Sequence, residues 1–145
     1  AGMQIRTEIE IQAPVAEVWK ALTDFAAYEQ WNPFITEISG ELRPGARLHV
    51  CLQLPEGGQQ RLRPVVLRAD PEQELRWRGK LLVGALFSGE HFFRLSAGSD
   101  ANSVRLVHGE DFSGVLVPYL HRSITLATRG FVYMNQALKR HLEQT

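Results

Sequence analysis

The sequence contains little cysteine and no excess of charge of either sign. Cys51 is the single cysteine, so no intramolecular disulfide can form, and such usage is typical of a reducing compartment. Its alternation with His49 and Gln53 predicts an outward-pointing, incidental thiol. Sixteen basic residues balance sixteen acidic ones, so the chain lacks the basic surplus that favours binding to nucleic acid or anionic membranes. We therefore expect a cytoplasmic protein with no nucleic-acid partner.

Long hydrophobic runs are also missing. The longest strongly apolar stretch, residues 81–87, contains a glycine and is far shorter than the roughly 20 residues that span a bilayer. The chain does not open with the basic and apolar regions of a secretory signal. Ala1 and Gly2, which precede Met3, are interpreted as vector-derived. These absences predict a protein that does not insert into a membrane.

What remains is the composition of an ordinary globular protein. The chain has 145 residues, of which 44% are hydrophobic and 22% are charged. A compact chain of this length buries about 70% of its unfolded surface, so it needs no disulfide to fold. We expect residues 3–145 to form a single domain.

The first third of the chain changes its hydrophobic period once. Residues 4–12 alternate strictly between apolar and polar side chains, which predicts a strand with one buried face. From Pro14 the apolar spacing becomes three and four residues, which predicts a short helix. Asp24 is a candidate N-cap for a second short helix, which Pro33 ends.

Strand patterns separated by turn residues then return. Six further strands are predicted at residues 35–42, 47–54, 60–69, 74–83, 90–97 and 103–112. The separators are too short for crossover helices, so these strands are expected to form an antiparallel meander. Pro64 cannot donate a ladder hydrogen bond and marks a bulge or an edge in its strand.

The chain ends in a long amphipathic helix, predicted from about residue 119 to 143. Only one of its faces is apolar, so it must lie across the inner face of the sheet. The predicted fold class is α+β: a curved, seven-stranded antiparallel sheet, two short helices after the first strand, and a long C-terminal helix across the sheet.

Six segments follow one another in a characteristic order and spacing. They are IQAPVAEVW at 11–19, WNPFI at 31–35, LRWRG at 75–79, GEHFF at 89–93, HGEDFSG at 108–114, and GF with MNQALK within 130–139. Together they resemble the START-like, or SRPBCC, superfamily, specifically its polyketide cyclase/dehydrase-like branch. The resemblance implies the helix-grip fold, with a cavity between sheet and C-terminal helix. It leaves the function open, because the superfamily includes lipid carriers, hormone receptors, cyclases and chaperone co-activators.

The predicted hairpin at residues 90–112 brings ionisable groups to the inner face of the sheet. If its turn centres between Ser99 and Asp100, His91 lies opposite His108, and the period of two places Glu110 on the same face. Each such group costs on the order of 1–3 kcal/mol when it is buried without a partner.

Three interpretations of this patch stay open. His91, His108 and Glu110 form a satisfied polar network, recognise the polar end of a mostly apolar ligand, or perform acid–base catalysis. A metal site is not favoured, because zinc sites need three or four ligands and no further cysteine or histidine joins these residues. We expect no metal and no cofactor.

Other candidate residues come from the C-terminal helix and from the large aromatic side chains. Thr128 and Asn135 interrupt an apolar helix stripe, which indicates either a ligand-filled cavity or polar groups satisfied within the core. The aromatic residues either pack in the core or, as the resemblance implies, lie near the cavity. The candidate ligand-binding residues are Trp31, Phe34, Trp77, Phe93, Phe112, Leu120, Ile124, Thr128, Phe131, Met134 and Asn135.

Three functions are compatible with these observations. The favoured hypothesis is binding of a small hydrophobic ligand, lipid-like or aromatic, in an internal cavity. The second is a cyclase/dehydratase-type enzyme that uses histidine and glutamate chemistry in that cavity, although the chain has no Gly-rich phosphate loop, HExxH, paired CxxC or nucleophile elbow. The third is a protein-interaction module with a vestigial cavity. A monomer and a homodimer are both compatible with the sequence.

Overall fold

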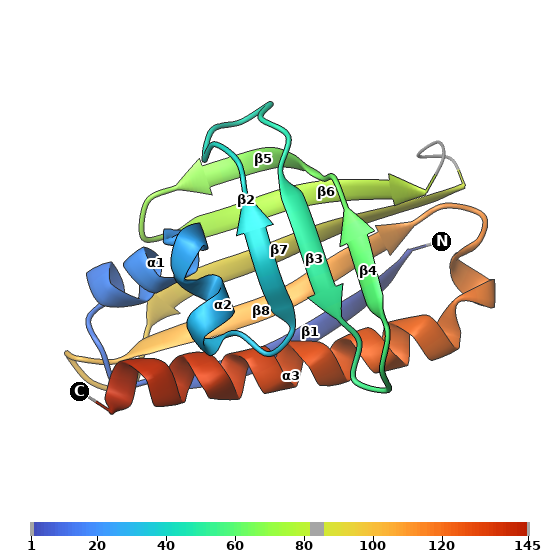
Figure 1. Cartoon of the computed structure of the whole chain (residues 1–145). Helices are drawn as coiled ribbons and strands as arrows, with labels where there is room; N and C mark the ends of the chain where they lie inside the picture. Colours follow the sequence, from blue (N-terminus) through green and yellow to red (C-terminus); the bar gives the residue numbers. More distant parts are fainter. Residues whose placement is uncertain (1, 82–85, 145) are drawn as a thin grey trace.

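The computed structural model describes residues 2–81 and 86–144 and shows two antiparallel sheets with a long C-terminal helix (Figure 1). The larger sheet consists, in spatial order, of β1 (Met3–Ile11), β8 (Val104–Ser113), β7 (Phe87–Ala97), β6 (Glu74–Leu81) and β5 (Val65–Asp70). The smaller sheet consists of β2 (Ile35–Ser39), β3 (His49–Gln53) and β4 (Gln59–Leu62).

The helical segments lie between β1 and β2 and after β8. The first group contains α1 (Val15–Thr23), the 3-10 turn η1 (Phe25–Ala27) and the single-turn α2 (Tyr28–Trp31). The second contains the 3-10 turn η2 (Val117–Tyr119) and α3 (His121–Glu143), which is about 34 Å long at 1.5 Å per residue. Within the described residues, no helix combines the length and the apolar character needed to cross a membrane.

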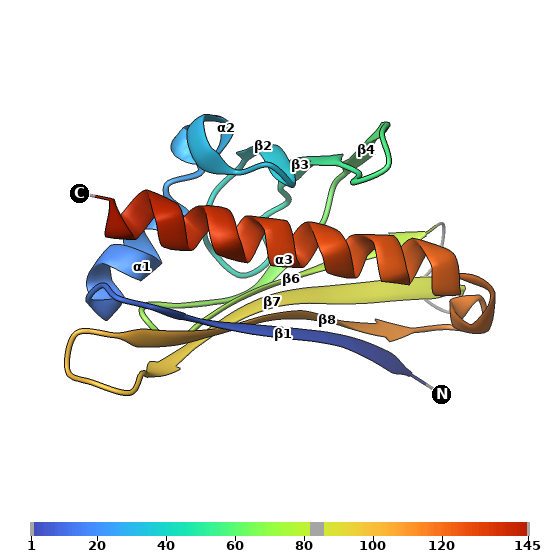
Figure 2. The ribbon, with the colours of Figure 1, turned by 90° about the horizontal axis from the view of Figure 1, so that it is seen from below.

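The helix α3 lies along the open side between the two sheets (Figure 2). Its apolar stripe, which includes Ile124, Phe131, Met134 and Leu138, is buried. Apolar residues of both sheets, α1 and α3 form one continuous core. Burial of this stripe is what stabilises the helix in place, because its other face is polar.

The prediction of one seven-stranded sheet is wrong. The segment 60–69 forms two strands, β4 and β5, which belong to different sheets. Pro64 stands at the break: it has no N–H to donate, while its carbonyl accepts a hydrogen bond of 2.8 Å from the Leu48 N–H. An isolated bridge between Arg47 and Val65 connects the two sheets beside it. The last residues predicted for the 74–83 strand, 82 and 83, lie outside the described residues.

The predicted register of the β7–β8 hairpin is also wrong, by two residues. Ala97 pairs with Val104, so the turn comprises six residues, in which the Gly98 N–H donates to the Ser103 carbonyl. His91 therefore lies opposite Glu110, not opposite His108. Because the shift is even, every side chain keeps its predicted face.

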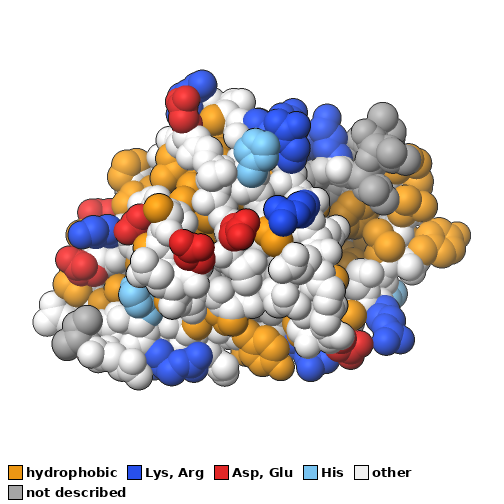
Figure 3. Space-filling view, in the orientation of Figure 1, with side chains coloured by type: hydrophobic (Ala, Val, Ile, Leu, Met, Phe, Trp, Pro, Cys, Tyr) orange, Lys and Arg blue, Asp and Glu red, His pale blue; other side chains and the backbone are white. Residues whose placement is uncertain are grey.

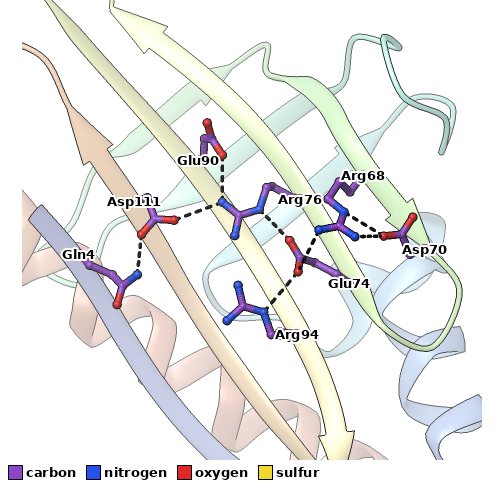
Figure 4. A network of polar contacts seen from close by, with 8 residues as sticks. All are labelled: Gln4, Arg68, Asp70, Glu74, Arg76, Glu90, Arg94 and Asp111. Atoms are coloured by element: carbon purple, nitrogen blue, oxygen red, sulfur yellow. Dashed lines mark hydrogen bonds and ion pairs between the residues drawn. The ribbon is translucent and has the colours of Figure 1, made fainter. Parts of the chain in front are cut away.

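Ion pairs on the outer face of the larger sheet hold together the strands that carry these inner-face residues (Figure 4). At their centre Arg76 of β6 contacts Glu74 at 2.7 Å, Glu90 at 2.9 Å and Asp111 at 3.2 Å. Its guanidinium also lies 4.7 Å from the ring centre of Phe92, which is buried beneath it. Arg76 thus links β6, β7 and β8 at the strand positions just behind the candidate site.

Candidate functional site

A cavity of about 290 Å³ lies between the two sheets and α3. Most of its wall is apolar and comes from Phe34, Ile35, Val50, Leu52, Leu62, Trp77, Phe87, Phe112, Leu120, Ile124, Ala127 and Phe131. His91 and Glu110 add buried and half-buried polar groups from β7 and β8. The other polar side chains of the wall, Gln60, Lys80 and Ser123, are exposed to solvent.

The cavity reaches the end of the molecule where β8 leads into α3. Hydrophobic side chains gather on the surface at this end (Figure 3). Among the described residues here, Val115 is 66% exposed and Tyr119 is 82% exposed. Leu120, which follows Tyr119 directly, is part of the cavity wall.

Eight of the residues proposed from the sequence come together at the cavity. They are His91, Glu110, Phe34, Trp77, Phe112, Leu120, Ile124 and Phe131. Four of them lie on the inner faces of β6, β7 and β8, and Ile124 and Phe131 lie on the buried stripe of α3, whereas Phe34 and Leu120 directly precede β2 and α3. Periodicity identified most of these positions, whereas Phe34 and Trp77 were proposed from the family resemblance.

The remaining candidates do not line the cavity. Phe93 and Met134 are buried in the core, and the Thr128 hydroxyl donates to the Ile124 carbonyl at 2.9 Å. Trp31 lies elsewhere, stacked on His141 with ring centres 5.6 Å apart, beside a surface groove of about 480 Å³.

Cys51, which we predicted to point outward, is only 3% exposed. It forms part of the wall of another groove, of about 500 Å³, on the far side of the smaller sheet. The prediction failed because this face of β3 is not open to solvent at Cys51, and Phe25 of η1 forms part of the same groove. The Cys51 thiol is therefore buried and not a surface group.

His108 and Asn135, the last two candidates, belong to a chain of hydrogen bonds that runs inward from the cavity. The Nδ1 of His91 lies 3.4 Å from Oε1 of Glu110, and its Nε2 lies 2.7 Å from Nε2 of His108. The Nδ1 of His108 lies 2.7 Å from Oδ1 of Asn135. The Asn135 amide donates to the Thr7 hydroxyl at 2.8 Å, and that hydroxyl donates to the His108 carbonyl at 2.6 Å.

Thr7 and the smaller sheet were not predicted to be part of the site. Thr7 lies on the inner face of β1 between isoleucines, and a polar residue at such a position was a usable signal. Ile35, Val50 and Leu52 carried no comparable signal, because nothing in their pattern indicates that their strands fold over the larger sheet.

Aromatic rings enclose both imidazoles. The His91 ring stacks on Trp77, with centres 5.0 Å apart and an angle of 20° between the planes. The His108 ring lies 4.3 Å from both Phe93 and Phe131, and is nearly parallel to the latter. His91 is 6% exposed and His108 is not exposed at all. Their hydrogen-bonding capacity must therefore be met by each other and by the polar side chains of the chain.

This environment makes the site electrically neutral. Burial lowers the pKa of His91 to about 3. Burial, together with the neighbouring His91, lowers the pKa of His108 well below its usual value, although the bond to Asn135 opposes the shift. Burial raises the pKa of Glu110 to about 8, and the charge of Asp111 adds to this effect. At pH 7 the site consists of two neutral imidazoles and a mostly protonated carboxyl group.

Glycine provides the room for that carboxyl group. The Oε2 of Glu110 lies against Gly89 of the neighbouring strand, and any Cβ at this position would collide with it. In the described part of the chain, no group of three or more histidine, cysteine, aspartate or glutamate side chains is arranged to hold a metal ion.

Comparison with known proteins relates the whole arrangement to one family. Residues 3–143 match the family described as "Polyketide cyclase / dehydrase and lipid transport". Comparison with curated proteins gives no match.

Solved structures share the fold at low sequence identity. A START superfamily protein from Mycobacterium smegmatis superposes with a TM-score of 0.77 at 19% identity, over 97% of each chain. A Mesorhizobium loti protein gives 0.75 at 22% identity, over 99% of this chain and 98% of the other. The di-domain ARO/CYC protein BexL from the BE-7585A biosynthetic pathway gives 0.74 at 12% identity, over 98% of this chain and 50% of BexL.

Proposed function

Because the chain belongs to the polyketide cyclase/dehydrase and lipid transport family, we propose that it binds a small hydrophobic ligand between its two sheets and α3. The observation that carries this proposal is the cavity itself, which has an apolar wall and a few polar groups. A protein-interaction module with a vestigial cavity would have a filled core instead.

The size of the cavity favours a compact ligand over a long-chain lipid. Its volume of about 290 Å³ is at the lower end of the range for ligand sites. A cavity of about 150 Å³ holds one benzene molecule, so roughly two fused rings fit here. Phe34, Trp77 and Phe131 supply aromatic surfaces against which such rings would pack. We therefore favour an aromatic, polyketide-like ligand.

One observation supports a second candidate, a cyclase/dehydratase-type enzyme. Burial raises the pKa of Glu110 to about 8, and the side chain lies in the cavity wall, where its protonated form would serve as a general acid. An enzyme of this kind would release water from a β-hydroxyketone of matching size: Glu110 would protonate the departing hydroxyl group, and the neutral imidazole of His91 would take the α-proton as the C=C bond forms. Glu110→Gln would then abolish that reaction while the substrate still binds.

The first test is native mass spectrometry of the purified protein, followed by denaturing extraction of any co-purifying compound. The second is calorimetric titration with naphthalene, an apolar probe of two rings. Ala127→Trp fills the cavity from α3 and should weaken naphthalene binding at least tenfold. Thr125→Trp, on the exposed face of the same helix, is the matched control and should leave binding unchanged. Equal affinities for both variants would exclude the cavity as the binding site.

A further inference from the structure

The direction of every hydrogen bond in the chain from His91 to Thr7 is fixed at its Thr7 end, away from the cavity. The Thr7 hydroxyl oxygen lies 2.6 Å from the carbonyl oxygen of His108. A carbonyl oxygen only accepts, so the Thr7 proton must point to it. The Thr7 oxygen is then left as an acceptor, which matches the amide N–H of Asn135 at 2.8 Å.

This direction determines which nitrogen of each histidine carries its proton. With the Asn135 amide nitrogen turned to Thr7, its Oδ1 faces Nδ1 of His108 at 2.7 Å, so that nitrogen must be protonated. A neutral imidazole has only one N–H, so Nε2 of His108 is an acceptor. The Nε2 of His91, 2.7 Å away, must therefore donate to it.

The consequence at the cavity is that the neutral His91 ring presents the lone pair of its Nδ1. Nδ1 of His91 is unprotonated, and reversing the chain would set the Thr7 and His108 oxygens against each other as two acceptors. Oε1 of Glu110 faces this lone pair. The two atoms can share a hydrogen bond only when the carboxyl group carries a proton. Their separation of 3.4 Å exceeds that of a close hydrogen bond, so the pairing is loose.

We propose that this pair recognises a neutral hydroxyl group, an alcohol or a phenol, at the polar end of the ligand. The hydroxyl would donate to Nδ1 of His91 and accept the proton of the Glu110 carboxyl group, replacing their long direct contact with two closer ones. This inference rests on the proposed function, since it specifies the ligand of the same cavity.

The same geometry disfavours an anionic ligand head. Neither imidazole supplies a positive charge, and Glu110 becomes a second anion when it ionises. Within the described part of the wall, Lys80 is the only cation, and it is exposed. Asp111, next to Glu110 along β8, points to the outer face, where Arg76 binds it. A carboxylate ligand therefore finds no buried counter-charge here.

The protonation pattern is tested without any ligand. In ¹⁵N-histidine NMR spectra of the wild-type protein, His108 should be protonated at Nδ1 and His91 at Nε2, with no change between pH 6 and 8. The opposite pattern, or a charged imidazole, would overturn the inference and leave the apolar cavity as the proposed binding site.

Ligand choice is tested by calorimetric titration of naphthalene, 2-naphthol and 2-naphthoate. The wild-type protein should bind 2-naphthol about tenfold more tightly than naphthalene, as expected for a new buried hydrogen bond, and 2-naphthoate less tightly than 2-naphthol. Preference for 2-naphthoate, or no preference for 2-naphthol over naphthalene, would overturn the inference. Failure of all three to bind would instead overturn the proposed function, and the inference with it.

Variants then assign the preference to the two residues. His91→Phe should abolish the advantage of 2-naphthol over naphthalene, whereas Glu110→Gln, whose amide still donates, should retain most of that advantage. His121→Phe, at an exposed histidine, is the matched control. The wild-type comparison of the three ligands needs no variant, so the test stands even if His91→Phe does not fold.

Discussion

His91 and His108 share a hydrogen bond between their Nε2 atoms, 2.7 Å apart, in surroundings that keep both imidazoles neutral. Protonating either ring would place a cation among aromatic side chains, and a second proton on His108 would put an N–H where the bond needs an acceptor. The pair is therefore stable only in a site that stays uncharged, and this gives the protein a characteristic dependence on pH.

The acid side of this dependence comes from the two histidines. Because the pKa of His91 is about 3 in the folded chain against an ordinary value of 6.5, the unfolded chain binds more protons between these pH values. The histidines' contribution to stability should therefore be fully present above about pH 6.5 and decrease as the pH falls, by up to about 1.4 kcal/mol per pH unit for each histidine. Urea denaturation between pH 4 and 7 measures this slope. His121→Gln, at an exposed histidine, should leave the slope unchanged.

The alkaline side comes from Glu110, with the opposite sign. Its pKa rises from an ordinary 4.5 to about 8 on folding, so the folded chain keeps a proton that the unfolded chain loses. Stability should fall as the pH rises through this window, and the decrease becomes visible between pH 6.5 and 8, where the histidines no longer oppose it. Glu110→Gln should flatten this limb, whereas Glu29→Gln, at an exposed carboxylate, should preserve it. A wild-type protein that is equally stable at pH 6.5 and 8 would contradict the prediction.

Asn135 and Thr7 should behave as one unit in stability measurements. Removing the Thr7 hydroxyl leaves the buried Asn135 amide without its acceptor, and removing the Asn135 amide leaves the buried His108 without a partner at Nδ1. Each loss should cost about 1–3 kcal/mol. Thr7→Val and Asn135→Leu should each destabilise the fold, and the double variant should lose less than the sum of the two, because the shared hydrogen bond is lost only once. The measurement is a double-mutant cycle by urea denaturation. Strict additivity would show that the bond does not contribute.

Periodicity predicted the inner face of β7 and β8 correctly and their register incorrectly. The face depends only on the period of two, which the alternation of His91, Phe93 and Leu95 expresses directly. The register depends on the length of the turn, and this turn is held by side-chain bonds between Asp100 and Ser103 that no alternation reports. Hence the residues of the polar patch were predicted correctly, but their cross-strand partners were not: His91 lies opposite Glu110 and not opposite His108.

A cavity between the sheet and the C-terminal helix was predictable, but the wall that the smaller sheet contributes to it was not. That wall is the smaller sheet, which separates from the larger one at Pro64. Proline on its own marks a break in a ladder without saying whether the chain bulges or leaves the sheet. Here the chain leaves the smaller sheet and enters the larger one, and a bridge between Arg47 and Val65 holds this change of sheet in place. A local hydrophobic pattern does not report a pairing between residues so far apart in the sequence.

Arg76 should contribute more stability than the exposed arginine beside it. Burial raises the pKa of Glu74, but the hydrogen bonds from Arg76 and Arg94 outweigh this and hold it below its usual value. Arg76→Met keeps the contact with Phe92 and removes the charge, and should cost about 2 kcal/mol, between the values for surface and buried ion pairs. Arg68→Met is the control.

Arg68 also contacts Glu74 but is 55% exposed, so its replacement should cost less than about 1 kcal/mol. Thermal denaturation of the two variants at pH 7 measures the difference. Equal losses for Arg68→Met and Arg76→Met would mean that the outer-face ion pairs act as ordinary surface pairs.

Gly130 should resist the substitution that usually stabilises a helix. Replacing an interior helical glycine by alanine ordinarily gains about 1 kcal/mol. A Cβ at this position of α3, however, would collide with the ring of Phe34, which is 2% exposed and packs against Phe131 with ring centres 5.5 Å apart. Phe34 lines the cavity, so a shift of its ring away from the new Cβ would reduce the space for a ligand. Gly130→Ala should therefore lower stability by about 1–3 kcal/mol and weaken naphthalene binding.

Thr125→Ala, on the exposed face of the same helix, provides the comparison for this change. It should raise the melting temperature slightly, because alanine favours the helix and nothing there opposes it. Both variants are followed by thermal denaturation and by naphthalene titration. If Gly130→Ala melted at a higher temperature than the wild type with naphthalene affinity intact, α3 would not approach Phe34 as closely as the structure places it, and the cavity would have to be larger at this point.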